Sequence, residues 1–268
     1  MGDFFGTPPG LALFLNAGDP PLDVLGDVVR MLDERGVDCL ELGVPFPDSV
    51  TDGPVIRRSA ERALADGVGL DEVLAFVADV QGSLARLRIV VFADWSHTVR
   101  PHTLDRFTAE VAASGAAGAL LHGVPPRVRP AYYEAAAAAG MPVVTTCYAQ
   151  SPPDVLAEAA RHVSAYVYLV AHYGKSGVGT APAADAVRAP IAALRAQTGA
   201  AIAVGFGVKA RADVARVHAL GADAAVVGTA GVACVEASRA AGGDVVADLA
   251  RWVSDLHPQP TPHTGAPR

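Results

Sequence analysis

Two acidic side chains occupy positions from which they could move protons. Glu41 lies in the apolar run 39–43, which is typical of a buried strand, and a buried carboxylate is costly unless it faces a polar cavity. Asp52 follows in the loop that precedes Pro54. A carboxyl group beside apolar walls has its pKa raised toward neutrality, so it can release and recover a proton. The two acids therefore predict acid–base catalysis at the mouth of one β–α unit.

Each acid also has a simpler explanation. Arginine or backbone donors could satisfy Glu41 inside the fold without any catalytic role. Asp52 could be an N-cap or turn residue, because Asp-Gly-Pro often precedes a helix and Pro54 suits the first helical position. The spacing alone does not separate these explanations for Asp52.

Glycine-rich turns later in the chain indicate phosphate binding. Gly205-Phe206-Gly207 follows the apolar run 200–204, and Gly228-Thr229 stands at the end of the run 223–228, with Thr229 just beyond it. Glycines let backbone N–H groups approach an anion, and a threonine hydroxyl can also donate. Tight-turn glycine is the alternative for both segments.

The segment 171–180 holds three glycines, two hydroxyl side chains and Lys175, which predicts a mobile lid that also contacts an anion through Gly177 and Gly179. A plain flexible loop has the same composition. A Schiff-base role for Lys175 is disfavoured, because such a lysine needs a rigid and desolvated place. His97, His122 and His172 do not have the close spacing of metal ligands, so no metal site is expected.

Short β-type runs alternate with helical patterns along most of the chain. The runs cover 11–16, 39–43, 88–93, 118–122, 142–147, 165–170, 200–204 and 223–228, and helical spacing is clear at 22–35, 104–114, 155–162, 184–197 and 212–220. Eight such units predict one (β/α)8 TIM barrel over residues 1–256, followed by a disordered tail at 257–268. A doubly wound sheet is the competing fold, but the turn after the first run lacks G-x-G-x-x-G.

The active site of such a barrel lies at the carboxyl ends of its strands. Alternation along each strand then assigns the side chains that face the lumen. It places Glu41 and Cys39 on the lumen side of their strand. By the same alternation, the following residues share the lumen side within each strand: Phe14 and Asn16, Leu120 and His122, and Tyr166 and Tyr168.

Composition narrows the class of partner. The formal charge of −7 and the absence of a basic stripe argue against nucleic acid or an anionic membrane as a partner. No apolar run is long enough to span a bilayer, and no secretory signal is visible. Three dispersed cysteines (Cys39, Cys147 and Cys234) are typical of reduced core residues. A cytoplasmic location is expected.

The order of motifs carries a family resemblance. Leu40-Glu41-Leu42-Gly43-Val44-Pro45-Phe46 with Asp48 and Asp52-Gly53-Pro54 closely resembles the signature of the tryptophan synthase α subunit. The segments 18–20, 166–168, 205–207 and 227–229 are also similar to that family, in the same order along the chain.

The resemblance implies a barrel lyase that cleaves indole-3-glycerol phosphate into indole and glyceraldehyde 3-phosphate, without metal or organic cofactor. Glu41 then corresponds to the general acid/base, and Asp52 to the residue that binds the indole N–H. Phe14 and Tyr168 match positions that line the indole and glycerol pocket, and Gly207, Gly228 and Thr229 match the phosphate binders. Phe206 and His122 are also expected at the substrate pocket, and Gly177 and Gly179 at the phosphate.

Several loops depart from the family pattern. His122 stands where the family has a small residue before an aspartate, Asp94-Trp95 replaces Asn-Pro, and the segment 173–180 is altered. These departures predict a diverged homologue that releases free indole without a β subunit, or that acts on a modified indole. Asp48 matches a subunit-contact position, so a β-like partner stays open. A barrel aldolase or isomerase with another phosphorylated substrate, and an inactive partner subunit, are the rival functions.

Overall fold

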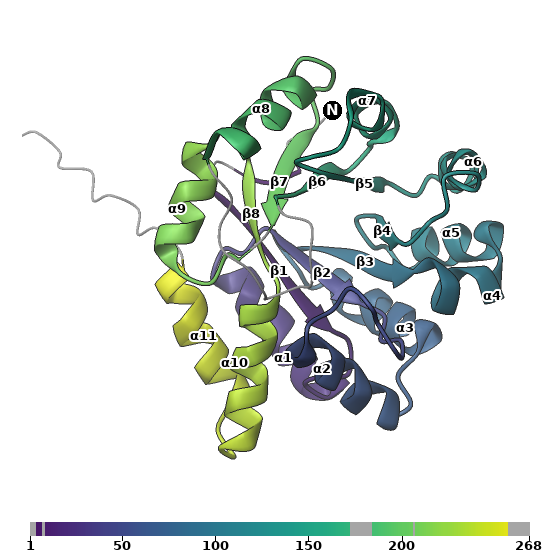
Figure 1. The fold of residues 1–268 in the computed structure, drawn as a ribbon. Coiled ribbons are helices and arrows are strands. Elements are labelled where there is room, and N and C mark those ends of the chain that lie inside the picture. The colour runs from purple at the N-terminus through teal and green to yellow at the C-terminus, as the bar shows by residue number, and fades with distance from the viewer. Residues whose placement is uncertain (1–3, 7–8, 172–183, 206, 257–268) are drawn as a thin grey trace, which may run out of the picture.

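The computed structural model describes residues 4–6, 9–171, 184–205 and 207–256. Within these residues, parallel strands form a closed barrel in the order β1 to β8, with β8 paired to β1 (Figure 1). The strands are β1 (Gly10–Asn16), β2 (Cys39–Gly43), β3 (Arg88–Asp94), β4 (Ala119–His122), β5 (Val143–Tyr148), β6 (Tyr166–Val170), β7 (Ala201–Gly205) and β8 (Ala224–Val227). The predicted (β/α)8 fold is confirmed.

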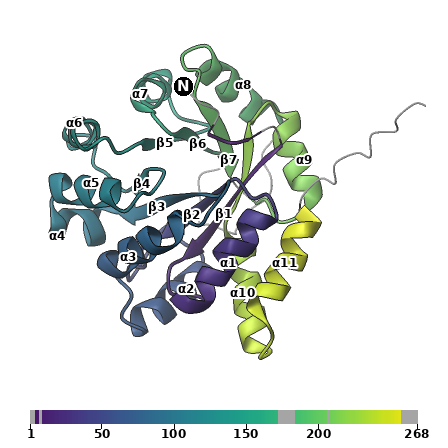
Figure 2. The same ribbon diagram turned by 180° about the vertical axis from the view of Figure 1, so that it is seen from behind.

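Helices surround the barrel on its outer face, as the view from behind also shows (Figure 2). They are α1 (Leu22–Glu34), α2 (Pro54–Ala65), α3 (Leu70–Gln81), η1 (Trp95–Val99), α4 (Arg100–His102), α5 (Leu104–Ala113), α6 (Arg129–Ala139), α7 (Pro153–His162), α8 (Ala184–Arg195), α9 (Arg211–Ala219), α10 (Thr229–Ala240) and α11 (Val245–Leu256). The predicted strands and helices agree with these bounds to within a few residues. The tail after residue 256 lies outside the described residues.

Glycines end several of the helices, as expected. Gly36, Gly115, Gly140 and Gly221 all have positive φ, between 69° and 95°. A residue with a Cβ is strained in this left-handed conformation, so glycine there lets the chain turn back toward the next strand.

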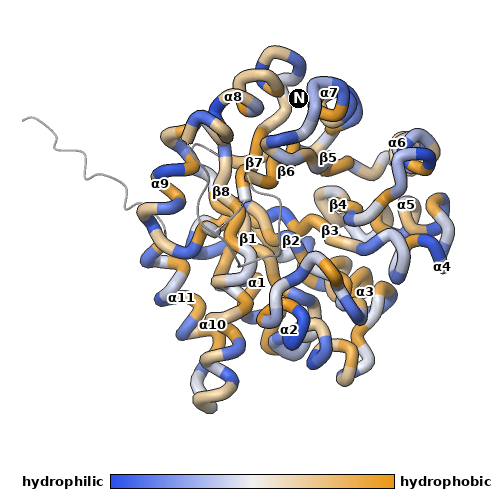
Figure 3. Tube along the Cα trace, in the orientation of Figure 1, coloured by the Kyte–Doolittle hydropathy of each residue, from blue (hydrophilic) through white to orange (hydrophobic). Residues whose placement is uncertain are grey.

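Side chains of alternating parity form two apolar layers, one between strands and helices and one inside the barrel. The tube coloured by hydropathy shows the strands as mostly apolar and the helices as mixed (Figure 3). Cys39, Leu120, Tyr166 and Tyr168 belong to the inner layer, which confirms their predicted orientation. Cys39 and Cys147 are buried free thiols, whereas Cys234 is only partly buried.

Aromatic residues before β1 fill the inside of the barrel next to Tyr166. The ring centroids of Phe4 and Phe5 lie 4.9 and 5.1 Å from that of Tyr166. Arg88 places its guanidinium carbon 4.9 Å from the centre of the Phe4 ring. This packing fixes the Tyr166 side chain from one side.

An ion-pair network connects the end of β1 with α2 and α10. The buried Asp19 carboxylate accepts hydrogen bonds from Arg62 at 2.7 and 3.1 Å, and it also pairs with Arg239. Glu236 accepts from Arg58 and from Arg62, and the Arg58 hydrogen bond is the largest cause that lowers the Glu236 pKa to about 2. The network therefore holds α2, the helix that follows the Asp52 loop, against α10.

Candidate functional site

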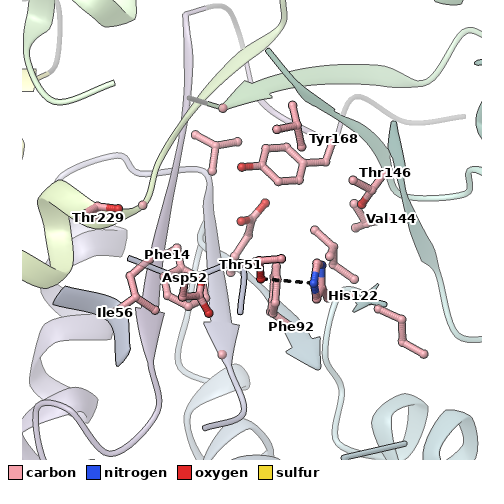
Figure 4. Close-up of a pocket in the computed structure, with 18 of the residues that line it drawn as sticks. Phe14, Thr51, Asp52, Ile56, Phe92, His122, Val144, Thr146, Tyr168 and Thr229 are labelled. Atoms are coloured by element: carbon pink, nitrogen blue, oxygen red, sulfur yellow. Dashed lines mark hydrogen bonds between the residues drawn. The ribbon is translucent and has the colours of Figure 1, made fainter. Parts of the chain in front are cut away.

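A cavity of about 1060 Å³ occupies the carboxyl-terminal mouth of the barrel. The predicted site residues that line it are Phe14, Glu41, Asp52, His122, Tyr168, Gly207, Gly228 and Thr229 (Figure 4). Phe206, Gly177 and Gly179 lie outside the described residues. The structure therefore brings the two acids and the glycines after β7 and β8 into one cavity.

Glu41 is buried, and its carboxylate has a tyrosine partner. The Tyr166 hydroxyl donates to Glu41 Oε1 at 2.5 Å. Burial raises the Glu41 pKa from 4.5 to about 7, and the Tyr166 hydrogen bond acts in the opposite direction. A carboxyl group with this pKa holds or releases a proton near neutral pH. The partner is thus a phenol, not the arginine or backbone donor considered from the sequence.

Asp52 belongs to a small hydroxyl-rich turn. Ser49 Oγ donates to Asp52 Oδ2 at 2.7 Å and accepts from the Asp52 N–H at 3.2 Å. The N-cap of α2 is Gly53, so the N-cap explanation for Asp52 is wrong, although the turn explanation agrees with these bonds. The turn presents the carboxylate to the cavity.

His122 lies at the end of β4 and contacts the same turn. Its Nε2 is 3.3 Å from Thr51 Oγ1, as the dashed line in Figure 4 marks. The imidazole stacks on Phe92 with ring centroids 6.3 Å apart and planes 17° apart. Phe92 in turn meets Phe14 edge to face at 5.5 Å. Together these rings form an apolar wall that suits a flat aromatic ligand.

Another part of the cavity wall is formed by Tyr168 on β6 and Gly205 on the neighbouring β7, where the tyrosine ring needs the space that glycine leaves. A Cβ added at Gly205 would collide with the phenol of Tyr168, so glycine at this place on β7 leaves room for that ring. Burial raises the Tyr168 pKa, and the nearby Glu41 raises it further. The phenol therefore stays protonated and can donate a hydrogen bond into the cavity.

The anion-binding features lie where β7 and β8 end. Gly207 has φ of 64°, and an added Cβ there would meet nothing within 4 Å, so this turn needs glycine for its backbone conformation. Gly228 is the N-cap of α10, and Thr229 is its first residue. The first N–H groups of a helix have no partner within the helix and attract anions. Lys209 lines the same cavity and adds a positive charge.

Several contacts of the site were not predicted from the sequence. Strand parity predicts that Tyr166 faces the lumen with Tyr168, but it does not predict the hydrogen bond of Tyr166 to Glu41. Ser49, Thr51 and Lys209 were not proposed as site residues either. The sequence feature that could have identified them is their position: two hydroxyl side chains lie within three residues of Asp52, and an ammonium group lies two residues after Gly207.

Metal binding finds no support in the described part of the chain, since no group of three or more His, Cys, Asp or Glu side chains there could hold an ion. His97 instead bonds to Asp94 Oδ1 at 2.8 Å and stacks on Phe46. None of the described helices is long and apolar enough to cross a membrane.

Known proteins resemble this chain over most of its length. The family model for the tryptophan synthase alpha chain matches residues 8–257. The tryptophan synthase alpha chain of Gloeobacter violaceus is 37% identical over 223 residues, which are 83% of this chain and 79% of that protein. The tryptophan synthase alpha chain of Dechloromonas aromatica is 34% identical over 248 residues, which are 91% of this chain and 91% of that protein.

Solved structures agree with this relationship. A mutant tryptophan synthase alpha-subunit from Pyrococcus furiosus superposes with a TM-score of 0.82 at 28% identity, over 93% of this chain and 98% of that one. Tryptophan synthase from Mycobacterium tuberculosis gives a TM-score of 0.79 at 26% identity, over 92% and 90% of the two chains.

Proposed function

We propose that this chain, which belongs to the tryptophan synthase alpha chain family, is a carbon–carbon lyase that cleaves indole-3-glycerol phosphate into indole and glyceraldehyde 3-phosphate. The observation that carries the proposal is the buried Glu41, whose pKa of about 7 suits proton donation and return at one place. Asp52 faces the same cavity, and the glycine turns after β7 and β8 lie at its edge.

In the first step, protonated Glu41 gives its proton to C3 of the indole ring. Positive charge then develops toward the ring nitrogen, where the Asp52 carboxylate accepts a hydrogen bond from the N–H and stabilises the cation. The bond between C3 and the glycerol carbon breaks, and its electron pair restores the aromatic ring. The hydroxyl on that glycerol carbon loses its proton to the Glu41 carboxylate and becomes the aldehyde. Glu41 is protonated again at the end.

The remaining residues orient the substrate. Phe14 and Phe92 form the apolar wall for the indole ring, and the Tyr168 phenol donates toward the glycerol chain. The phosphate group is assigned to the N–H groups around Gly207 and Gly228 and to the Thr229 hydroxyl. Lys209 adds a cation beside them.

A β-like subunit is the proposed protein partner, and its contact surface includes the loop between β2 and α2. Val50 in this loop is 81% exposed and is the exposed large hydrophobic residue among those the structure describes. Asp48, two residues earlier, adopts a left-handed backbone with φ of 56°. An exposed apolar side chain on a strained loop next to the active site favours an interface. Release of free indole without a partner is the second candidate, and the departures from the family pattern around the site (His122, Asp94 and Trp95) favour it.

The direct test is incubation of the purified protein with indole-3-glycerol phosphate and detection of indole, alone and with a tryptophan synthase β subunit. We expect indole in both cases and faster release with the partner. Absence of indole under both conditions would reject the lyase function and favour another phosphorylated substrate. Equal rates with and without the β subunit would support the stand-alone enzyme and reject the partner.

A further inference from the structure

The barrel wall is incomplete between β4 and β5. Along the described chain these strands pair at Ala119 with Val143 and at Leu120 with Val144, and the ladder does not continue to their carboxyl ends. By contrast, β1 and β2 stay paired up to Asn16 and Gly43. In Figures 1 and 2, β4 and β5 lie on the side of the barrel where α6 is found.

The cavity passes through this gap. Its lining includes the lumen residues Leu120 and Val144 and also Leu121, which belongs to the outer apolar layer, and Thr145, whose hydroxyl bonds to α7. Beyond the strands, it continues under α6 and α7. We call this part the side lobe, and its lining residues are Leu121, Tyr132, Tyr133, Thr145, Val155 and Ala159.

The side lobe contains one polar group without a partner. Tyr132 is 3% exposed, and its hydroxyl has no hydrogen-bond partner among the described residues. A buried hydroxyl left unpaired costs free energy comparable to a lost hydrogen bond, so such groups usually meet a ligand or water. The Thr145 hydroxyl, in contrast, donates to the Ala159 carbonyl at 3.0 Å. The Tyr133 hydroxyl also has a partner, since it bonds to Glu158, which pairs with Arg129 at 3.3 Å at the edge of the lobe. The remaining lining side chains are apolar.

The position of the lobe fits one end of the proposed substrate. Thr229 at the phosphate end and His122 lie on opposite sides of the pocket, and Val144 and Thr146 lie on the His122 side (Figure 4). If C3 of the indole faces Glu41 and its N–H faces Asp52, carbons 5 and 6 form the edge farthest from both acids. That edge is then directed away from the phosphate, toward β4 and β5.

We infer that the side lobe is a binding subsite for a substituent on carbon 5 or 6 of the indole, so that the natural substrate is a ring-substituted indole-3-glycerol phosphate. The inference rests on the proposed lyase function. The apolar lining selects a short carbon chain or ring, and the Tyr132 hydroxyl selects an oxygen on that substituent, to which it donates. The total volume of about 1060 Å³ is also slightly above the usual size of ligand pockets, roughly 300–1,000 Å³.

Binding of alkoxyindoles tests the subsite without any turnover. Calorimetry is used to compare indole with its 5- and 6-methoxy, ethoxy and propoxy derivatives. We expect at least one alkoxyindole to bind several-fold more tightly than indole. Val155→Phe, which fills the lobe, should abolish this preference, whereas Val155→Ala should keep it. If indole and all derivatives bind alike, or if the preference survives Val155→Phe, the inference is wrong.

The hydroxyl of Tyr132 is tested with its neighbour as the matched control. Tyr132→Phe should reduce the preference for the alkoxyindole by roughly three- to tenfold, the value of one hydrogen bond. Tyr133→Phe removes a hydroxyl of the same helix that already bonds to Glu158, so it is not free to meet a substituent and its loss should leave the preference in place. An equal effect of both variants would overturn the role of Tyr132.

Turnover separates the two proposals. With the matching substituted indole-3-glycerol phosphate, kcat/KM should exceed that for the unsubstituted substrate, and the ratio should fall below one in Val155→Phe. Cleavage of both substrates with no preference would reject the side lobe but keep the lyase. Cleavage of neither, together with selective alkoxyindole binding, would reject the lyase but keep the subsite.

Discussion

The Tyr166 hydroxyl on β6 donates to the Glu41 carboxylate on β2 at 2.5 Å, across the inside of the barrel. Three strands lie between β2 and β6 on either side of the closed barrel, so each side chain approaches the centre from the opposite wall. Burial raises the Glu41 pKa, and this bond limits the rise to about 7. The proton affinity that burial gives the proposed catalytic acid is therefore lowered by a residue 125 positions away in the sequence.

Replacement of Glu41 by glutamine should remove catalysis and keep binding. Gln is similar in size but cannot give or take the proton, and loss of general acid–base catalysis costs about 10²–10⁴-fold in rate. We expect kcat to fall by at least that factor while the Kd for indole-3-glycerol phosphate, measured by calorimetry, changes little. Near-normal kcat in Glu41→Gln would contradict the assigned role.

Tyr166→Phe should shift the pH dependence of kcat/KM toward higher pH. The hydrogen bond lowers the Glu41 pKa, so its loss raises that pKa above about 7. Because the first step needs protonated Glu41, the decline of activity at alkaline pH should begin later in the variant. The measurement is a pH–rate profile from pH 5 to about 10. An unchanged alkaline limb would show that Tyr166 does not set this pKa.

Stability should also depend on the Glu41 proton. In the folded protein the pKa is about 7, against 4.5 for an ordinary glutamate, so the folded state binds the proton more tightly. The resulting stabilisation is fully present below pH 4.5 and is lost as the pH rises through 7, by roughly 3 kcal/mol. Urea unfolding at several pH values should show this difference between the wild type and Glu41→Gln. Parallel pH curves for the two proteins would contradict it.

Lys209 should affect phosphate binding and little else. Its ammonium group lines the cavity next to the Gly207 turn, so Lys209→Gln should raise KM for indole-3-glycerol phosphate roughly three- to tenfold with little change in kcat. Binding of free indole should not change. Arg211→Gln is the matched control, because Arg211 bonds to backbone carbonyls of α11 instead. Equal effects of both variants would point to general electrostatics.

The sequence predicted what depends on local patterns. Apolar runs that end in polar or glycine residues located every strand, and the parity of Phe14, Glu41 and Tyr168 placed them in the lumen. Local patterns cannot report contacts between distant segments. The bond between Tyr166 and Glu41, the contact of Thr51 with His122, and the network around Asp19 each join parts of the chain that only the closed barrel brings together.

The short ladder between β4 and β5 has a consequence for the cohesion of the whole barrel. The chain divides there into two halves, β1–β4 and β5–β8, which remain firmly paired at β1 and β8. The boundary between β4 and β5 is held by few backbone hydrogen bonds. The backbone amides along this boundary should therefore exchange with solvent faster than those of the other strands. Any molecule that occupies the space behind this boundary would join the halves, and its binding free energy would add directly to the stability of the fold.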